Sequence, residues 1–89
     1  MSNITSEEIF DVVKKHLTET VDTINPDDVK RDSSMKELGA SSMDIVEVVS
    51  CSMRELRVRV PRNELSSLKN IGELADLLER VIQEKSAAN

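Results

Sequence analysis

The sequence predicts an all-α protein, a small four-helix bundle with a long first loop and a short third helix. Apolar residues recur at helical spacing in three long stretches, and 38% of the 89 residues are hydrophobic. Two glycines and two prolines are too few for a turn-rich β fold. A chain of this size buries only about 60–65% of its unfolded surface. We therefore expect one domain over residues 1–89, with a core over about 6–83 and a frayed tail over 84–89.

The first helix is predicted from about Ser6 to Glu19. Thr5 and Glu8 have the spacing of a capping box, in which each side chain binds the other residue's backbone N–H. The apolar residues that follow at helical spacing are Ile9, Val12, Val13 and Leu17, with Phe10 at the edge of the stripe.

A long loop is predicted from Thr20 to Lys36, where the periodicity fades and Pro26 offers turn chemistry. A connection of this length in a small domain needs apolar anchors. We expect the anchors to be Val21, Ile24, Val29 and Met35.

The second helix is predicted to begin at Ser42 and to run for about fifteen residues. Its apolar residues on or near one face are Met43, Val46, Val48 or Val49, Met53 and Leu56. The β-branched content also suits a strand, but strict alternation would bury Asp44 with Val46. Residues 57–63 are expected to form the loop that follows this helix, because Pro61 disfavours a helical conformation at Val60.

Two helices complete the prediction. Residues 62–68 are expected to hold one short helical turn capped by Asn63. The last long helix is expected from about Ile71 to Gln83, with Asn70 as its cap and Glu73 three residues later.

Composition excludes several functions. Seventeen acidic residues against twelve basic ones, with one aromatic residue, make a nucleic-acid partner improbable on charge and stacking. No stretch approaches the roughly 20 apolar residues of a membrane span, and we expect a cytoplasmic monomer.

The lone Cys51 predicts a small buried side chain and no metal site. His16 is expected to be a solvated helix residue, and no nucleophile, base and orienting group occur together as an enzyme needs.

Ser41 and Ser42 follow Gly39 and open the second predicted helix. The first N–H groups of a helix lack partners and its dipole is positive there, so an anion attached at that point is stabilised. A serine in this place is more often a cap alone. On spacing alone, two capping serines with no further role are the simpler interpretation.

The segment over residues 38–47, Leu-Gly-Ala-Ser-Ser-Met-Asp-Ile-Val-Glu, resembles the attachment motif of acyl carrier proteins. In that family a Leu-Gly-x-Asp-Ser-Leu pattern opens the second helix, and its serine takes 4′-phosphopantetheine from coenzyme A. The expected order of helices also resembles the family over roughly residues 6–83. The resemblance implies that Ser42 carries the arm, whose thiol holds acyl groups as thioesters. Ser41 replaces the family's usual aspartate, which leaves open the preference of the modifying enzyme and which serine it modifies.

The resemblance also implies partners. A phosphopantetheinyl transferase would attach the arm, and the second helix would meet other enzymes through Met43, Asp44, Ile45 and Glu47. Asp44 and Glu47 can also be ordinary solvated carboxylates. Arg54, Arg57, Arg59 and Arg62 depart from the acidic carriers of bacterial fatty acid synthesis.

The chain is most similar to free-standing carriers of polyketide pathways that serve β-branching. This similarity implies an acyltransferase, a ketosynthase-type decarboxylase and a hydroxymethylglutaryl-synthase-type enzyme as partners. A carrier of fatty acid synthesis and an unmodified helical interaction module are the alternatives.

Overall fold

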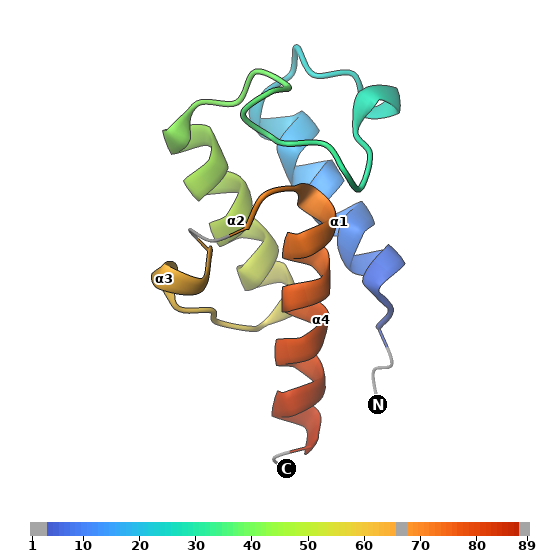
Figure 1. Ribbon diagram of the computed structural model, residues 1–89, viewed down its shortest axis with the longest axis vertical. Helices are drawn as coiled ribbons and strands as arrows, with labels where there is room; N and C mark the ends of the chain where they lie inside the picture. The colour runs from blue at the N-terminus through green and yellow to red at the C-terminus, as the bar shows by residue number, and fades with distance from the viewer. Residues whose placement is uncertain (1–3, 66–67, 88–89) are drawn as a thin grey trace.

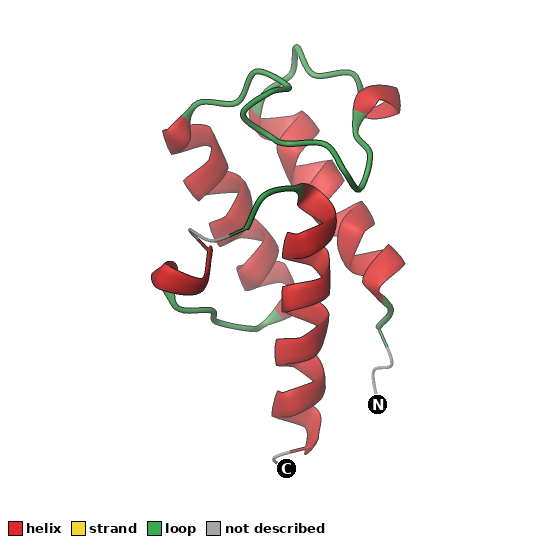
Figure 2. Cartoon of the chain, viewed as in Figure 1, coloured by secondary structure: helices red, strands yellow, loops and turns green. Residues whose placement is uncertain are grey.

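The computed structural model describes residues 4–65 and 68–87 and contains helices and loops, with no strand in these ranges (Figures 1 and 2). The elements in chain order are α1 (Ser6–Thr20), the 3-10 helix η1 (Pro26–Asp28), α2 (Ser42–Leu56), α3 (Arg62–Leu65) and α4 (Ile71–Ala87). The predicted all-α fold, with a long first loop and a short third helix, is confirmed.

Helix α1 is the centre of the packing, since it contacts both α2 and α4. It begins with the predicted capping box: the Thr5 hydroxyl accepts from the Glu8 N–H at 3.2 Å, and the Glu8 carboxylate accepts from the Thr5 N–H at 3.3 Å. Ile9, Val13 and Leu17 are fully buried along one face. Partners on α4 include Ile71, Ala75 and Leu78, which are also fully buried.

The long loop crosses the end of the bundle where α1 finishes and α2 starts (Figure 1). Ile24 and Val29 are buried and Val21 and Met35 are half-buried against the core, as predicted. Two backbone hydrogen bonds tie the loop to the start of α4. The N–H of Ile71 donates to Ser33 at 2.9 Å, and the N–H of Gly72 donates to Arg31 at 2.7 Å.

The inward face of α2 differs from the prediction. Met43 is 82% exposed and Val46 is 56% exposed, so neither belongs to the core. The buried residues of α2 are Val48, Val49 and Ser52. Ser52 can occupy a core position because its hydroxyl donates to the Val48 carbonyl at 2.8 Å. Met53 and Leu56 pack against the core as predicted, so the predicted stripe is wrong at Met43 and Val46 alone.

The end of α2 agrees with its predicted length of about fifteen residues. The helix stops at Leu56, and Arg57 follows in the left-handed region with φ of 59°. The N–H of Val58 donates to the Met53 carbonyl at 3.0 Å, which closes the helix with a C-terminal cap normally built on glycine. Arginine at such a position gave no sequence signal.

The later helices also have shifted ends. Helix α3 begins at Arg62, directly after Pro61, so Asn63 lies inside the helix and not at the position before it. Ser66 and Ser67 lie outside the described residues. Asn70 caps α4 as predicted, because its side chain accepts from the Glu73 N–H at 2.8 Å. Helix α4 continues past Gln83 to Ala87, where the sequence supplies good helix formers; residues 88–89 of the predicted tail lie outside the described ranges.

Two side chains between α1 and α2 differ from their predicted surroundings. Cys51 is half-buried, whereas full burial was predicted. His16 is also largely covered, with its side chain 17% exposed and its Nε2 only 2.7 Å from Glu55 Oε1. The same carboxylate accepts from Lys15 Nζ at 2.9 Å, so Glu55 links α2 to α1.

Candidate functional site

The turn before α2 is held in place by short-range hydrogen bonds. The N–H groups of Leu38, Gly39 and Ala40 donate to the carbonyls of Ser34, Lys36 and Met35, at 3.0, 3.1 and 3.0 Å. Ala40 is buried and Leu38 packs against the core. Gly39 has φ of 114°, a conformation that other residues rarely adopt. The turn therefore presents the two serines from a fixed point of the backbone.

Ser41 is the N-cap of α2. Its hydroxyl accepts from the Asp44 N–H at 3.1 Å, and the Asp44 carboxylate accepts from the Ser41 N–H at 3.0 Å. This reciprocal pair is a capping box in which aspartate takes the place of the usual glutamate. The Ser41 hydroxyl is thus engaged in starting the helix.

Ser42 is the first residue of α2 and is exposed. Across the described ranges, its hydroxyl has no hydrogen-bond partner. It stands beside the unpaired N–H groups at the helix start, where the dipole favours a negative group. A phosphate ester on this oxygen fits the position, because it would disturb no existing contact and would gain this electrostatic stabilisation.

The predicted partner-binding residues lie in different surroundings. Met43 and Glu47 are exposed, and Asp44 is half-buried with one oxygen engaged in the cap. Ile45 packs against the core, so little of it faces a partner. Val46, which was predicted to lie in the core, is exposed one turn from Ser42. Val46 is three residues after Met43 and four after Ser42, so helical spacing places all three residues on one face.

Glu47 has a neighbour of its own on α2. Its Oε2 accepts from the Cys51 thiol at 3.4 Å, and this hydrogen bond raises the pKa of Cys51 above its ordinary value. The thiol is consequently kept in its protonated, less nucleophilic form.

Metal-binding clusters and membrane-spanning helices are both absent from the described part of the chain. Within residues 4–65 and 68–87, no three His, Cys, Asp or Glu side chains are grouped so that they could hold a metal ion. Among the helices described, none combines the length and apolar character that crossing a bilayer requires.

Comparison with known proteins identifies the family of this site. Residues 11–78 match the family model described as the phosphopantetheine attachment site. This match covers most of the chain and includes the whole of the turn, both serines and α2.

Individual relatives agree with the family model. The polyketide biosynthesis acyl-carrier-protein AcpK of Bacillus subtilis is 34% identical over 86% of this chain and 94% of its own length. The acyl carrier protein of a Sulfurovum species is 31% identical over 82% of this chain and 97% of its own.

A solved structure shares the fold. It is a carrier described as the acetyl donor, crystallised in complex with the HMG synthase of the curacin biosynthetic pathway. The similarity has a TM-score of 0.79 and 32% sequence identity, and it covers 86% of this chain and 99% of the matched one. The chain therefore belongs to the acyl carrier protein family, whose members carry a covalently attached 4′-phosphopantetheine.

Proposed function

We propose that Ser42 is the residue that carries the phosphopantetheine arm, and that Ser41 serves only as the cap. The observation that carries this proposal is the different use of the two hydroxyls. The Ser41 hydroxyl accepts a hydrogen bond from Asp44, while the Ser42 hydroxyl is exposed and has no partner among the described residues. A transferase reaches the second oxygen without breaking the start of α2.

The arm supplies a terminal thiol that holds an acyl group as a thioester and so activates it for attack by partner enzymes. The residues of this chain position the arm and identify the carrier to its partners. The capping box fixes the direction of α2, and exposed Met43, Val46 and Glu47 surround the attachment point. Apolar side chains on the exposed face of a helix are typical of a docking surface.

We further propose a role in polyketide biosynthesis, as a donor of acetyl or malonyl units in β-branching. Support comes from the similarity to the polyketide carrier AcpK and to the acetyl-donor carrier bound to the curacin HMG synthase. Under this proposal the partners are a phosphopantetheinyl transferase, an acyltransferase, a ketosynthase-type decarboxylase and an HMG-synthase-type enzyme. The chain itself would catalyse no reaction and would act in the cytoplasm as a monomer.

The experiment is the intact mass of the protein after incubation with coenzyme A, Mg²⁺ and a promiscuous phosphopantetheinyl transferase, followed by mapping of the modified peptide. We expect one phosphopantetheine per chain, on Ser42. Ser42→Ala should be folded by circular dichroism and gain no mass, and Ser41→Ala should still be modified.

Modification of Ser42→Ala would move the attachment point to Ser41. A folded wild-type protein that no transferase modifies would favour an unmodified interaction module. To separate the pathways, the modified protein is then offered to a malonyl-loading acyltransferase and a decarboxylating ketosynthase. Formation of an acetyl thioester would support the β-branching role, and elongation to longer acyl chains would support fatty acid synthesis.

A further inference from the structure

The exposed face of α2 carries charges of opposite sign at its two ends. Glu47 lies near the Ser42 end, and Arg54 lies in the last turn. Residues seven apart share a helix face and are separated by about 10 Å along the axis. One face of α2 is therefore acidic near Ser42 and basic two turns further on.

Two arginines, Arg54 and Arg59, lie at the basic end. Within the described ranges, neither Arg54 nor Arg59 forms an ion pair with any carboxylate. Glu55 is next to Arg54 in sequence but is engaged with Lys15 at 2.9 Å and with His16 at 2.7 Å. The carboxylate of Glu55 therefore points to α1 and does not pair with Arg54.

Helix stability accounts for only part of this charge. Cations in the last turn of a helix interact favourably with its dipole, which explains Arg54 and the cap residue Arg57. Arg59 lies two residues beyond the cap and is exposed. The dipole gives no reason for a third arginine there.

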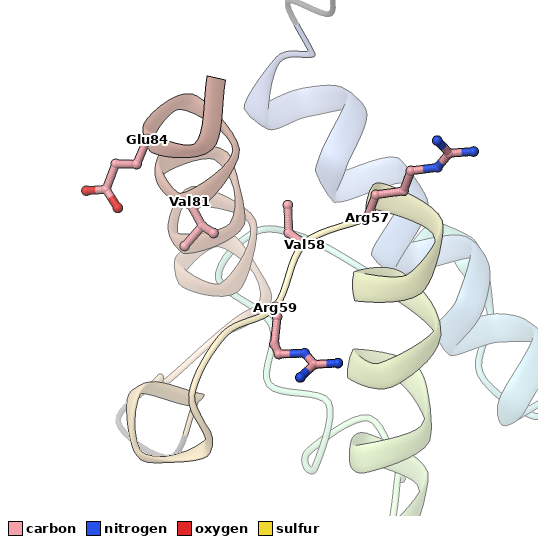
Figure 3. A pocket seen from close by; sticks show the side chains of 5 residues that line it. All are labelled: Arg57, Val58, Arg59, Val81 and Glu84. Carbon is pink, nitrogen blue, oxygen red and sulfur yellow. The ribbon is translucent and has the colours of Figure 1, made fainter. Parts of the chain in front are cut away.

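A groove adjoins Arg57 and Arg59, the arginines that follow α2. It has a volume of about 600 Å³ and lies between α4 and the segment after α2, lined by Arg57, Val58, Arg59, Val81 and Glu84. Figure 3 shows the two valines between these elements, the arginines extending on the side of α2, and Glu84 on the far side of α4. The groove thus combines an apolar middle with a basic rim next to α2.

We propose that the C-terminal end of α2, with Arg54, Arg59 and this groove, is a second docking surface that binds an acidic amphipathic segment of the partner enzyme. This proposal rests on the proposed carrier function. The partner would present a basic patch to Glu47, close to the place where the arm on Ser42 enters the partner. It would present an acidic segment to the arginines about 10 Å further along α2. An apolar side chain of that segment would enter the groove between Val58 and Val81.

Opposite charges at the two ends fix the orientation of the carrier. A uniformly acidic helix can slide or turn on a basic surface, whereas a helix with two signs fits in one direction. The net charge of −5 repels an acidic segment from most of this protein. Binding of such a segment therefore requires the local group of arginines.

The test uses a synthetic ten-residue amphipathic peptide of glutamate and leucine as the probe, titrated into the full-length protein at low salt and followed by amide NMR shifts. We expect the shifts to centre on residues 54–59 and around Val81. The double variant R54E/R59E should weaken the apparent affinity roughly tenfold or more. The matched control K30E/K36E makes the same charge change on the exposed first loop and should bind the peptide as wild type does.

Shifts that fall elsewhere, an absence of shifts, or unchanged affinity in R54E/R59E would overturn the proposal. Analytical ultracentrifugation tests separately whether the arginines bind a second copy of this chain. A wild-type dimer that R54E/R59E abolishes would assign the arginines to self-association and would also overturn it. The peptide titration uses the protein without the phosphopantetheine arm. A failure to attach the arm would therefore reject the proposed carrier function, whereas a failure to bind the peptide would reject only the second docking surface.

Discussion

The backbone N–H of Gly72 donates to the carbonyl of Arg31 at 2.7 Å, and this contact fixes the long loop against the start of α4. A Cβ added at Gly72 would lie 2.8 Å from that carbonyl oxygen and 3.1 Å from the Arg31 Cβ. The glycine is thus required by the close approach of two backbone segments. Around it, the Arg31 guanidinium binds Asp76 at 2.8 Å and Ser6 at 2.9 Å, so three parts of the chain meet there.

Gly72→Ala should destabilise the protein, because the methyl group forces the loop away from α4 and lengthens the hydrogen bond. Overpacking at such a contact typically costs about 1–3 kcal/mol in the free energy of unfolding. Urea denaturation followed by circular dichroism measures this value. Gln83→Ala, on the exposed side of the same helix, is the control and should change stability little. Wild-type stability in Gly72→Ala would mean that the loop does not depend on this approach.

Arg31→Ala tests the side chains of the same junction. The substitution removes the ion pair with Asp76, the hydrogen bond to Ser6 and the contact over the Phe10 ring, whose centroid lies 5.7 Å from the guanidinium carbon. All three are solvent-accessible, so we expect a loss of only about 0.5–1.5 kcal/mol in the free energy of unfolding.

Arg31→Lys separates the effect of the positive charge from the effect of the guanidinium shape. Lysine retains the charge but cannot bind two partners in the same plane, and so it should recover only part of the loss in the same urea denaturation. Full recovery by lysine would assign the whole effect to charge.

The helices and their starts could be predicted from sequence because they depend on local chemistry. The Thr5 and Asn70 caps are recognisable from side chains within a few residues of one another. The end of α2 was predicted as well, but its cap and the ends of the later helices were not. Arg57 takes a left-handed conformation that carries no signature in an arginine, and the ends of α3 and α4 depend on their packing.

The attachment segment was located by its motif, but the surface around it required tertiary structure. Whether Met43 and Val46 face the solvent depends on where α1 lies against α2. The burial of Ser52 also gave no sequence signal, because it depends on a hydrogen bond from its hydroxyl to the Val48 carbonyl. Similarly, only the structure distinguishes the engaged hydroxyl of Ser41 from the open one of Ser42.

Glu55→Gln tests the link between α1 and α2 through pH. The hydrogen bond from Lys15, followed by that from His16, holds the pKa of Glu55 below its ordinary value. A carboxylate with a depressed pKa in the folded state contributes stability above its unfolded pKa, about 4.3, and loses it as pH falls through the lower folded pKa. The wild-type protein should therefore lose more stability than Glu55→Gln over this acidic window.

Thermal unfolding between pH 7 and pH 3 measures the difference. The two melting temperatures should be furthest apart near neutral pH and should converge in acid. Lys15→Met is the complementary variant, because it removes the first partner of Glu55 and should reduce the pH dependence in the same direction. Curves that stay parallel would show that Glu55 is equally easy to protonate in the folded and unfolded states.

Ser41→Ala tests the cap separately from the attachment point. Loss of the side chain that accepts from Asp44 should reduce the free energy of unfolding by about 1 kcal/mol. The measurement is again urea denaturation, and modification by the transferase should persist. Ser41→Asn, which caps as well as serine, should keep wild-type stability.

Ser41→Asp restores the residue that carrier proteins usually have before the modified serine. Aspartate and serine cap helices about equally, so stability should stay within about 0.5 kcal/mol of wild type. The added charge is exposed and lies next to Ser42, where a basic transferase surface would approach. An exposed ion pair contributes about 0.2–1 kcal/mol, which corresponds to an increase of up to about fivefold in the modification rate at limiting carrier concentration.

The rate is measured by intact mass at low and at high ionic strength, with neutral Ser41→Asn as the matched control. We expect the gain in Ser41→Asp to shrink as salt screens the pair. An equal gain in Ser41→Asn would attribute the effect to the shape of the cap, and no gain in either would mean that the transferase does not approach through residue 41. A salt-dependent gain in the aspartate variant alone would show that Ser41 lowers recognition by this class of transferase.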